Sequence, residues 1–141
     1  MTSSGIAYSY GVLRLVPHPF LGTFVNVGVV LHARTTEFLD LRVLANPRVL
    51  RRCAPEVDLE LLLRYLASCE AVCRGDVSAG PIALLPTSER FHWLTAPRSD
   101  VLQCSPVHTG ITSDPAAALE ELYEREVAAP ARTLWPEEER T

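Results

Sequence analysis

Two stretches near the N-terminus carry the clearest pattern of hydrophobic and polar positions. Residues 6–16 and 23–32 are rich in β-branched and aromatic residues, which pack well on a pleated sheet. The connection at 17–22 contains two prolines and a glycine, and it is too short for the crossover that parallel strands need. The two stretches are therefore predicted to form an antiparallel hairpin.

Alternation along the second stretch separates two faces. One face is entirely apolar and is expected to pack on the core; it comprises Val25, Val27, Val29 and Leu31. Asn26 and Gly28 lie on the opposite face, where Arg14 of the first stretch can meet them. We interpret this polar group beside a glycine as a first candidate site. The alternative is a solvated face on which Gly28 marks a β-bulge.

The sequence that follows the hairpin predicts one more strand and a long helix. Residues 38–44 alternate, although imperfectly, and a third strand there would complete a three-stranded meander. Residues 58–74 place apolar side chains at the i, i+3, i+4 and i+7 spacing of an amphipathic helix, and Gly75 is suited to end it. This helix is expected to cover the apolar face of the sheet.

Short elements and loops alternate in the second half of the chain. Residues 81–86 form an apolar run between prolines, typical of an edge strand or an extended connector, and 87–94 predict a helical turn. Residues 100–104 predict a further strand. A second main helix begins at Asp114, because this Asx cap precedes a proline, and Pro130 ends it.

These elements predict an α+β fold, in which an N-terminal antiparallel sheet, arranged as a meander, is covered by two main helices. A length of 141 residues suits one domain, which we set at 6–128, followed by a flexible C-terminal tail at 129–141. A hydrophobic content of 48% supports a packed core and argues against wholesale disorder.

Composition narrows the classes of partner. The net charge of −4 argues against nonspecific binding to duplex nucleic acid. All 13 basic residues are arginine, which we interpret as the composition of a GC-rich genome rather than as selection for anion binding. No apolar run is long enough to span a membrane, and the N-terminus has neither the basic nor the apolar region of a signal peptide. These features predict a cytoplasmic protein.

The four cysteines are then expected to be reduced thiols. Cys69 and Cys73 are four residues apart on one face of the predicted helix, as two small core residues would be. No second pair of ligands accompanies them, so we predict no metal site, and no motif calls for a cofactor.

A second polar stretch, residues 90–110, holds further candidates. Its proposed ligand-binding residues are Arg90, His92, Arg98 and Thr109, and His108 is the candidate catalytic residue. His108 lies between a predicted strand end and the N-terminus of a capped helix, where free amide groups attract anions. A Ser105/His108 nucleophile pair lacks the surrounding Gly-x-Ser-x-Gly elbow. The alternative is that His92 and His108 are hydrogen-bonding loop residues.

Several segments of the chain match a pattern seen elsewhere. The first half contributes Tyr8–Pro17 and Phe24–Leu31, and the second half contributes Arg90–Leu94, Ala96–Ser99 and Pro106–Gly110. On these segments the chain resembles a small bacterial family that is known only as domain of unknown function 3037.

The resemblance spans residues 6–127 and implies no established activity. Some members of that family are encoded beside kinases that look like the toxin kinase of bacterial persistence modules, which implies a protein partner. Gly11 and Cys104 stand at positions where other small or polar residues would be expected in that family, and we assign them no role.

Two classes of function follow. In the first, the protein is a non-catalytic binding or accessory module that recognises a partner protein or an anionic ligand. In the second, it is a small hydrolase or phosphoryl-handling enzyme in which His108, or else His92, acts as acid and base and arginines stabilise negative charge. We favour the first, because no complete catalytic set is present. Either class would be strengthened if one cleft united Arg14, Asn26, Arg90, Arg98 and His108.

Overall fold

The computed structural model describes residues 5–17, 23–96 and 101–134. The strands are β1 (Ile6–Leu15), β2 (Val25–Ala33), β3 (Phe38–Val43), β4 (Leu102–Cys104) and β5 (His108–Thr112). The α-helices are α1 (Pro47–Cys53), α2 (Leu59–Arg74), α3 (Thr87–Thr95), α4 (Pro115–Tyr123) and α5 (Ala129–Ala131). A π-helical segment, Glu124–Ala128, joins α4 to α5, and 3₁₀ turns occupy Arg34–Thr36, Val77–Ala79, Pro81–Leu84 and Arg132–Leu134.

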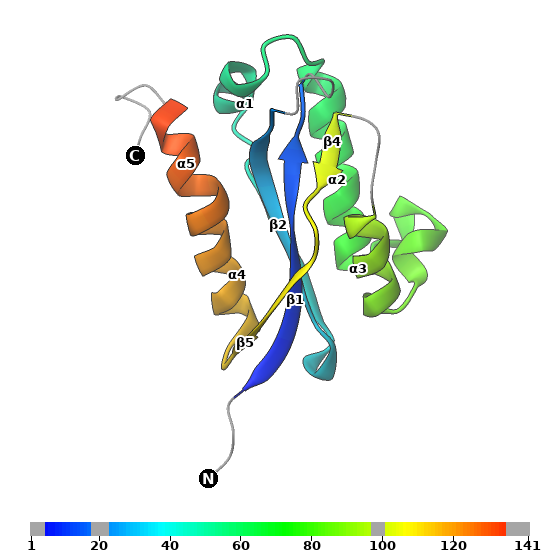
Figure 1. Ribbon diagram of the computed structural model, residues 1–141. Coiled ribbons are helices and arrows are strands. Elements are labelled where there is room, and N and C mark those ends of the chain that lie inside the picture. The colour runs from blue at the N-terminus through cyan, green and yellow to red at the C-terminus, as the bar shows by residue number, and fades with distance from the viewer. Residues whose placement is uncertain (1–4, 18–22, 97–100, 135–141) are drawn as a thin grey trace.

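The strands form one antiparallel sheet in the order β3-β2-β1, with β4 and β5 both paired to β1 (Figure 1). The hairpin β1–β2 and the meander that β3 completes are as predicted. β4 pairs with residues 13–15 of β1 and β5 pairs with residues 6–10, so two strands from the second half of the chain pair with the first strand. The α+β class is confirmed.

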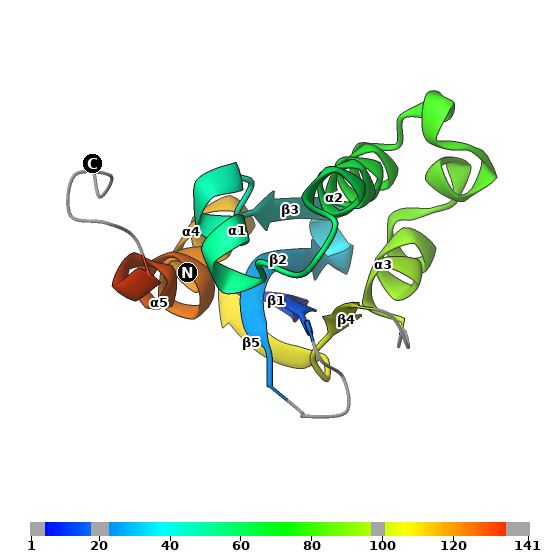
Figure 2. The same ribbon diagram turned by 90° about the horizontal axis from the view of Figure 1, so that it is seen from above.

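Helices cover both faces of this sheet, with α2 and α3 on one side and α4 and α5 on the other (Figure 2). Every residue of β2 from Val27 to Ala33 is therefore buried. The alternative interpretation, in which the face of β2 that carries Val30 and His32 is solvated, is wrong, because both residues are buried beneath the α2–α3 layer. The local pattern of β2 could not reveal that both faces are covered, because the two helical layers come from separate parts of the chain, residues 59–95 and 115–131.

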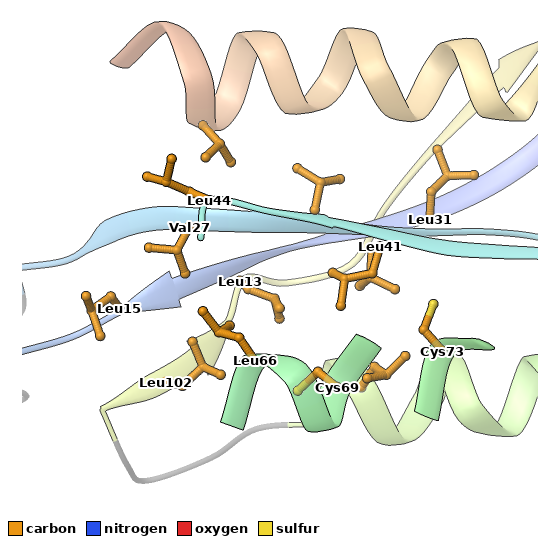
Figure 3. Close-up of a cluster of buried hydrophobic side chains, with 14 of the residues drawn as sticks. Leu13, Leu15, Val27, Leu31, Leu41, Leu44, Leu66, Cys69, Cys73 and Leu102 are labelled. Atoms are coloured by element: carbon orange, nitrogen blue, oxygen red, sulfur yellow. The ribbon is translucent and has the colours of Figure 1, made fainter. Parts of the chain in front are cut away.

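The core accordingly has two halves, one on each side of the sheet. Leu31 of β2 points toward the layer of α4, whereas Leu13 and Leu41 point toward α2 and its residue Leu66 (Figure 3). Cys73 on α2 is buried here, and burial raises the pKa of its thiol to about 12. This thiol is therefore inert, as the prediction of a core cysteine requires.

A β-bulge interrupts the pairing of β1 with β2. Leu13 lies opposite Gly28 and Arg14 lies opposite Asn26, so Val27 is an extra residue in β2. The bulge reverses the alternation, because Asn26 bonds to the α4–α5 layer whereas the Cα of Gly28 faces Leu13 on the α2 side. Asn26 and Gly28 therefore do not share a face as predicted, although a bulge does lie beside Gly28.

The C-terminal helix begins as predicted, since the Asp114 carboxylate accepts hydrogen bonds from two main-chain N–H groups of the first turn. The prediction that Pro130 ends it is wrong, because helical backbone continues through Pro130 to residue 134. Proline has no N–H to give to the carbonyl of Glu126, and the side chain of Asn26 donates to that carbonyl at 2.9 Å instead. Residues 129–134 of the predicted tail are thus helical, and residues 135–141 lie outside the described part of the chain.

Candidate functional site

The predicted site residues fall into separate parts of the molecule. Arg14 and Asn26 lie on the face of the sheet that α4 and α5 cover, whereas Arg90 belongs to α3 on the other face. His108 lies on β5 at the edge of the sheet, and Arg98 lies outside the described residues. The described residues therefore do not converge in one cleft.

Arg14 and Asn26 are brought together as the hairpin predicted. They are direct cross-strand partners, and the guanidinium carbon of Arg14 stands 4.1 Å from the ring centroid of Phe24. The amide nitrogen of Asn26 is occupied by the carbonyl of Glu126. The Arg14 Nε and the Asn26 Oδ1 are buried without a hydrogen-bond partner. The main role of Asn26 here is to anchor the π-helical segment to the sheet.

Arg90 holds main-chain carbonyls rather than facing a cavity. Its Nε donates to the carbonyl of Leu85 at 2.8 Å, and its terminal nitrogen donates to those of Cys73 at 2.8 Å and Val72 at 3.2 Å. The carbonyls of Val72 and Cys73 belong to the last turn of α2, where the main chain of the helix leaves acceptors without helical donors. Arg90 therefore fixes the end of α2, and a ligand contact by this side chain stays a prediction.

His92 and Thr109 line a groove between α3 and the sheet, which we call the α3 groove. It consists of two adjoining hollows of about 490 Å³ each, which share Ser9 and His32. The first is lined by Ala7, Tyr8, Ser9, His32, Arg34, Thr109, Gly110 and Ile111. The second is lined by Ser9, His32, Ser88, Phe91, His92, Thr95, Ala96 and Val107.

His32 lies at the junction of the two hollows. Its ring stacks on Phe91 with centroids 5.4 Å apart, and its Nε2 lies 3.1 Å from the hydroxyl oxygen of Thr87. Burial lowers the pKa of His32 below the ordinary value of 6.5, and the positive charges of Arg34 and Arg90 lower it further. The imidazole is therefore neutral at pH 7, in a positive local potential.

The prediction from sequence did not single out His32, because on its face of the second stretch only Asn26 and Gly28, beside Arg14, were taken as a candidate site. The only signal was its position, a titratable ring at the end of a strongly apolar strand. In the folded protein Phe91 of α3 stacks on the His32 ring, and 8% of the residue is exposed.

The composition of the groove wall determines its chemistry. Among the described residues that line the two hollows, Arg34 is the single formally charged one, and none is a carboxylate. The rest of the polar lining consists of imidazole rings and hydroxyl groups, including Ser9, Ser88 and Thr109. Such a wall offers hydrogen-bond donors and positive charge, which suit an anionic group.

The arrangement expected for catalysis is absent from the described residues. The hydroxyl of Ser105 accepts the N–H of Val12 at 2.9 Å and donates to the carbonyl of Pro106 at 2.8 Å, which joins β4 to β5. His108 lies in strand β5 rather than in the predicted loop, and its exposed ring stands 5.4 Å from that of Tyr10. Within this part of the chain, no three His, Cys, Asp or Glu side chains are grouped as metal ligands would be.

Across the described residues, no helix has the length and apolar character needed to cross a membrane. No curated protein and no solved structure matches the chain. A family model described as protein of unknown function (DUF3037) matches residues 10–127, which include the whole sheet from the middle of β1 onward and the helices of both layers. The chain therefore belongs to the DUF3037 family.

Proposed function

We propose that the protein is a binding module that recognises an anionic group in the α3 groove. The observation that carries this proposal is the composition of the groove wall, which has an arginine, two histidines and several hydroxyls but no carboxylate. The chain as a whole carries a net charge of −4, so this wall departs from the average of the molecule.

The electrostatics of His32 support the sign of the ligand. Burial is the largest cause that lowers the pKa of the His32 imidazole, which lies where the two hollows meet, and the positive charges of Arg34 and Arg90 lower it further. An anion placed there would interact favourably with that charge in a partly desolvated site, where ion pairs are stronger than in bulk water. Bound anion should in turn favour the protonated form of His32.

Binding is better supported than catalysis. The ring of His108, the predicted acid and base, packs against the ring of Tyr10, on the face of the sheet that α4 covers. The hydroxyl of Ser105 is hydrogen-bonded to the main chain of Val12 and Pro106. We propose that the anionic group belongs to a small ligand or to a protein partner in the bacterial cytoplasm, such as the neighbouring kinases that the family resemblance implies.

A titration followed by NMR tests the proposal. Inorganic phosphate, phosphoserine and adenosine monophosphate are added in turn to the ¹⁵N-labelled protein, and the expected shifts centre on His32, His92 and Thr109. Arg34→Gln should weaken binding roughly tenfold, because it removes a charged hydrogen-bond donor. Arg64→Gln, an exposed arginine of α2 outside the groove, is the matched control.

Either of two results overturns the proposal. One is the absence of groove shifts with all three anions while the protein is folded. The other is equal binding by Arg34→Gln and the unchanged protein.

A further inference from the structure

Strand β5 lies on an outer edge of the sheet, beside the α3 groove. It pairs with residues 6–10 of β1, whose other side is taken by β2, and β3 forms the opposite edge (Figure 2). An edge strand presents main-chain N–H and C=O groups to which a further strand can bond. The sequence of β5, His-Thr-Gly-Ile-Thr, is rich in β-branched residues, which suit extended pairing. β5 is therefore a place where the sheet can be extended.

One side of β5 forms the outer wall of the α3 groove. Val107, Thr109 and Ile111 alternate along the chain, so they share one side of the strand, and all three line the groove. Val107 is 47% exposed and Ile111 is 75% exposed, which are high values for large apolar side chains. Two exposed apolar side chains thus flank the hydroxyl of Thr109.

The register of the sheet places the polar part of the groove level with Thr109. Thr109 lies opposite Ser9 of β1, and Ser9 lies opposite His32 of β2. Because neighbouring strands are about 4.8 Å apart, this polar row begins at the edge of the sheet and runs inward to the imidazole. Arg34, which directly follows β2, lines the same hollow and brings a positive charge to it.

From this arrangement we infer that the partner of the α3 groove is an acidic protein segment in extended conformation, which adds to the sheet as a strand beside β5. The inference deepens the proposed function and rests on it, because the acidic side chain is the anion that the groove binds. Main-chain hydrogen bonds to the edge supply affinity in this mode of recognition, and alternate side chains supply selectivity.

The alternation of the added strand determines its sequence pattern, which is apolar-x-acidic-x-apolar. Side chains two positions apart lie on the same side of a strand. The two apolar side chains of the segment cover Val107 and Ile111, and the acidic side chain between them lies beside Thr109, in the hollow that Arg34 lines.

Synthetic peptides separate the main chain from the charge. The reference is acetyl-Thr-Val-Thr-Glu-Thr-Val-Thr-amide, titrated into the ¹⁵N-labelled protein, and it should shift the amide signals of β5 and His32. Replacement of its glutamate by glutamine should weaken binding roughly tenfold, because a charged hydrogen bond is lost. Two further peptides are N-methylated at alternate residues. Only alternate N–H groups of an added strand face the sheet, so one of these peptides should lose binding and the other should keep it.

Two protein variants test the apolar contact. Ile111→Ala should weaken the reference peptide about threefold, because less apolar surface is covered, and should leave the binding of inorganic phosphate unchanged. Val77→Ala is the matched control, since Val77 is 72% exposed and is not among the residues that line the groove. It should change neither affinity.

The inference fails if the two N-methylated peptides bind with equal affinity, because an added strand uses only one set of its N–H groups. It also fails if the reference peptide produces no shifts in β5, or if the glutamine peptide binds as tightly as the reference. Inorganic phosphate tests the groove by itself. Phosphate shifts at His32 without peptide shifts in β5 overturn this inference alone, whereas the absence of anion shifts overturns the proposed function.

Discussion

The α3 groove and the α2 cavity, a hollow of about 340 Å³ beside the start of α2, contrast in composition. Among the described residues, the walls of the groove are polar and carry an arginine, two histidines and no carboxylate, whereas those of the cavity are mainly apolar and carry the carboxylates of Glu56 and Asp58. Residues of α2 line the cavity and residues of α3 line the groove, and the net charge of the chain is −4. The contrast teaches that net charge does not determine the sign of a ligand, because a few residues lining each hollow set its local potential.

Reversal of one charge in the groove should produce the largest effect. Arg34→Glu places a carboxylate where the anion is proposed to bind, so phosphate affinity should fall about a hundredfold, through loss of an ion pair and gain of repulsion. The melting temperature of the variant, measured on the same sample, should stay close to that of the unchanged protein. A large fall in melting temperature would show that the substitution damages the fold, and retained phosphate binding would remove the groove from consideration.

The next effect in size concerns the free energy of unfolding, whose dependence on pH should report the titration of His32. Its folded-state pKa lies below 6.5, so the unfolded chain takes up a proton first as the pH falls. The stabilising contribution is complete above pH 6.5 and is lost as the pH falls from there through the folded-state pKa. Denaturant unfolding at a series of pH values should show this slope, and His32→Gln should reduce it. Phosphate bound in the groove should raise the pKa of His32.

Part of the candidate site was predictable because it depends on local pairing. Arg14 and Asn26 come from adjacent strands of one hairpin, and the structure places them opposite each other. Arg90, His92 and His108 come from elements whose relative positions depend on the whole fold, so their expected convergence did not follow from their proximity in sequence. No sequence pattern distinguished Glu56 and Asp58 as residues that line a cavity, because an acidic residue at a helix start is common.

The sequence by itself determined the elements whose signals are short in range. Strand alternation fixed the β1–β2 hairpin, leucine spacing and Gly75 fixed α2, and Asp114 with its following proline fixed the start of α4. These features depend on residues within a few positions of one another, so local propensity decides them.

Only the tertiary structure decided which faces are buried and which residues share a hollow. The second helical layer over β2, the return of β5 to β1 and the bond from Asn26 to Glu126 join residues about a hundred positions apart. Such contacts depend on how the layers pack and on which main-chain groups lack a partner, as at Pro130. No periodicity in the sequence encodes that information, because it arises when distant elements meet.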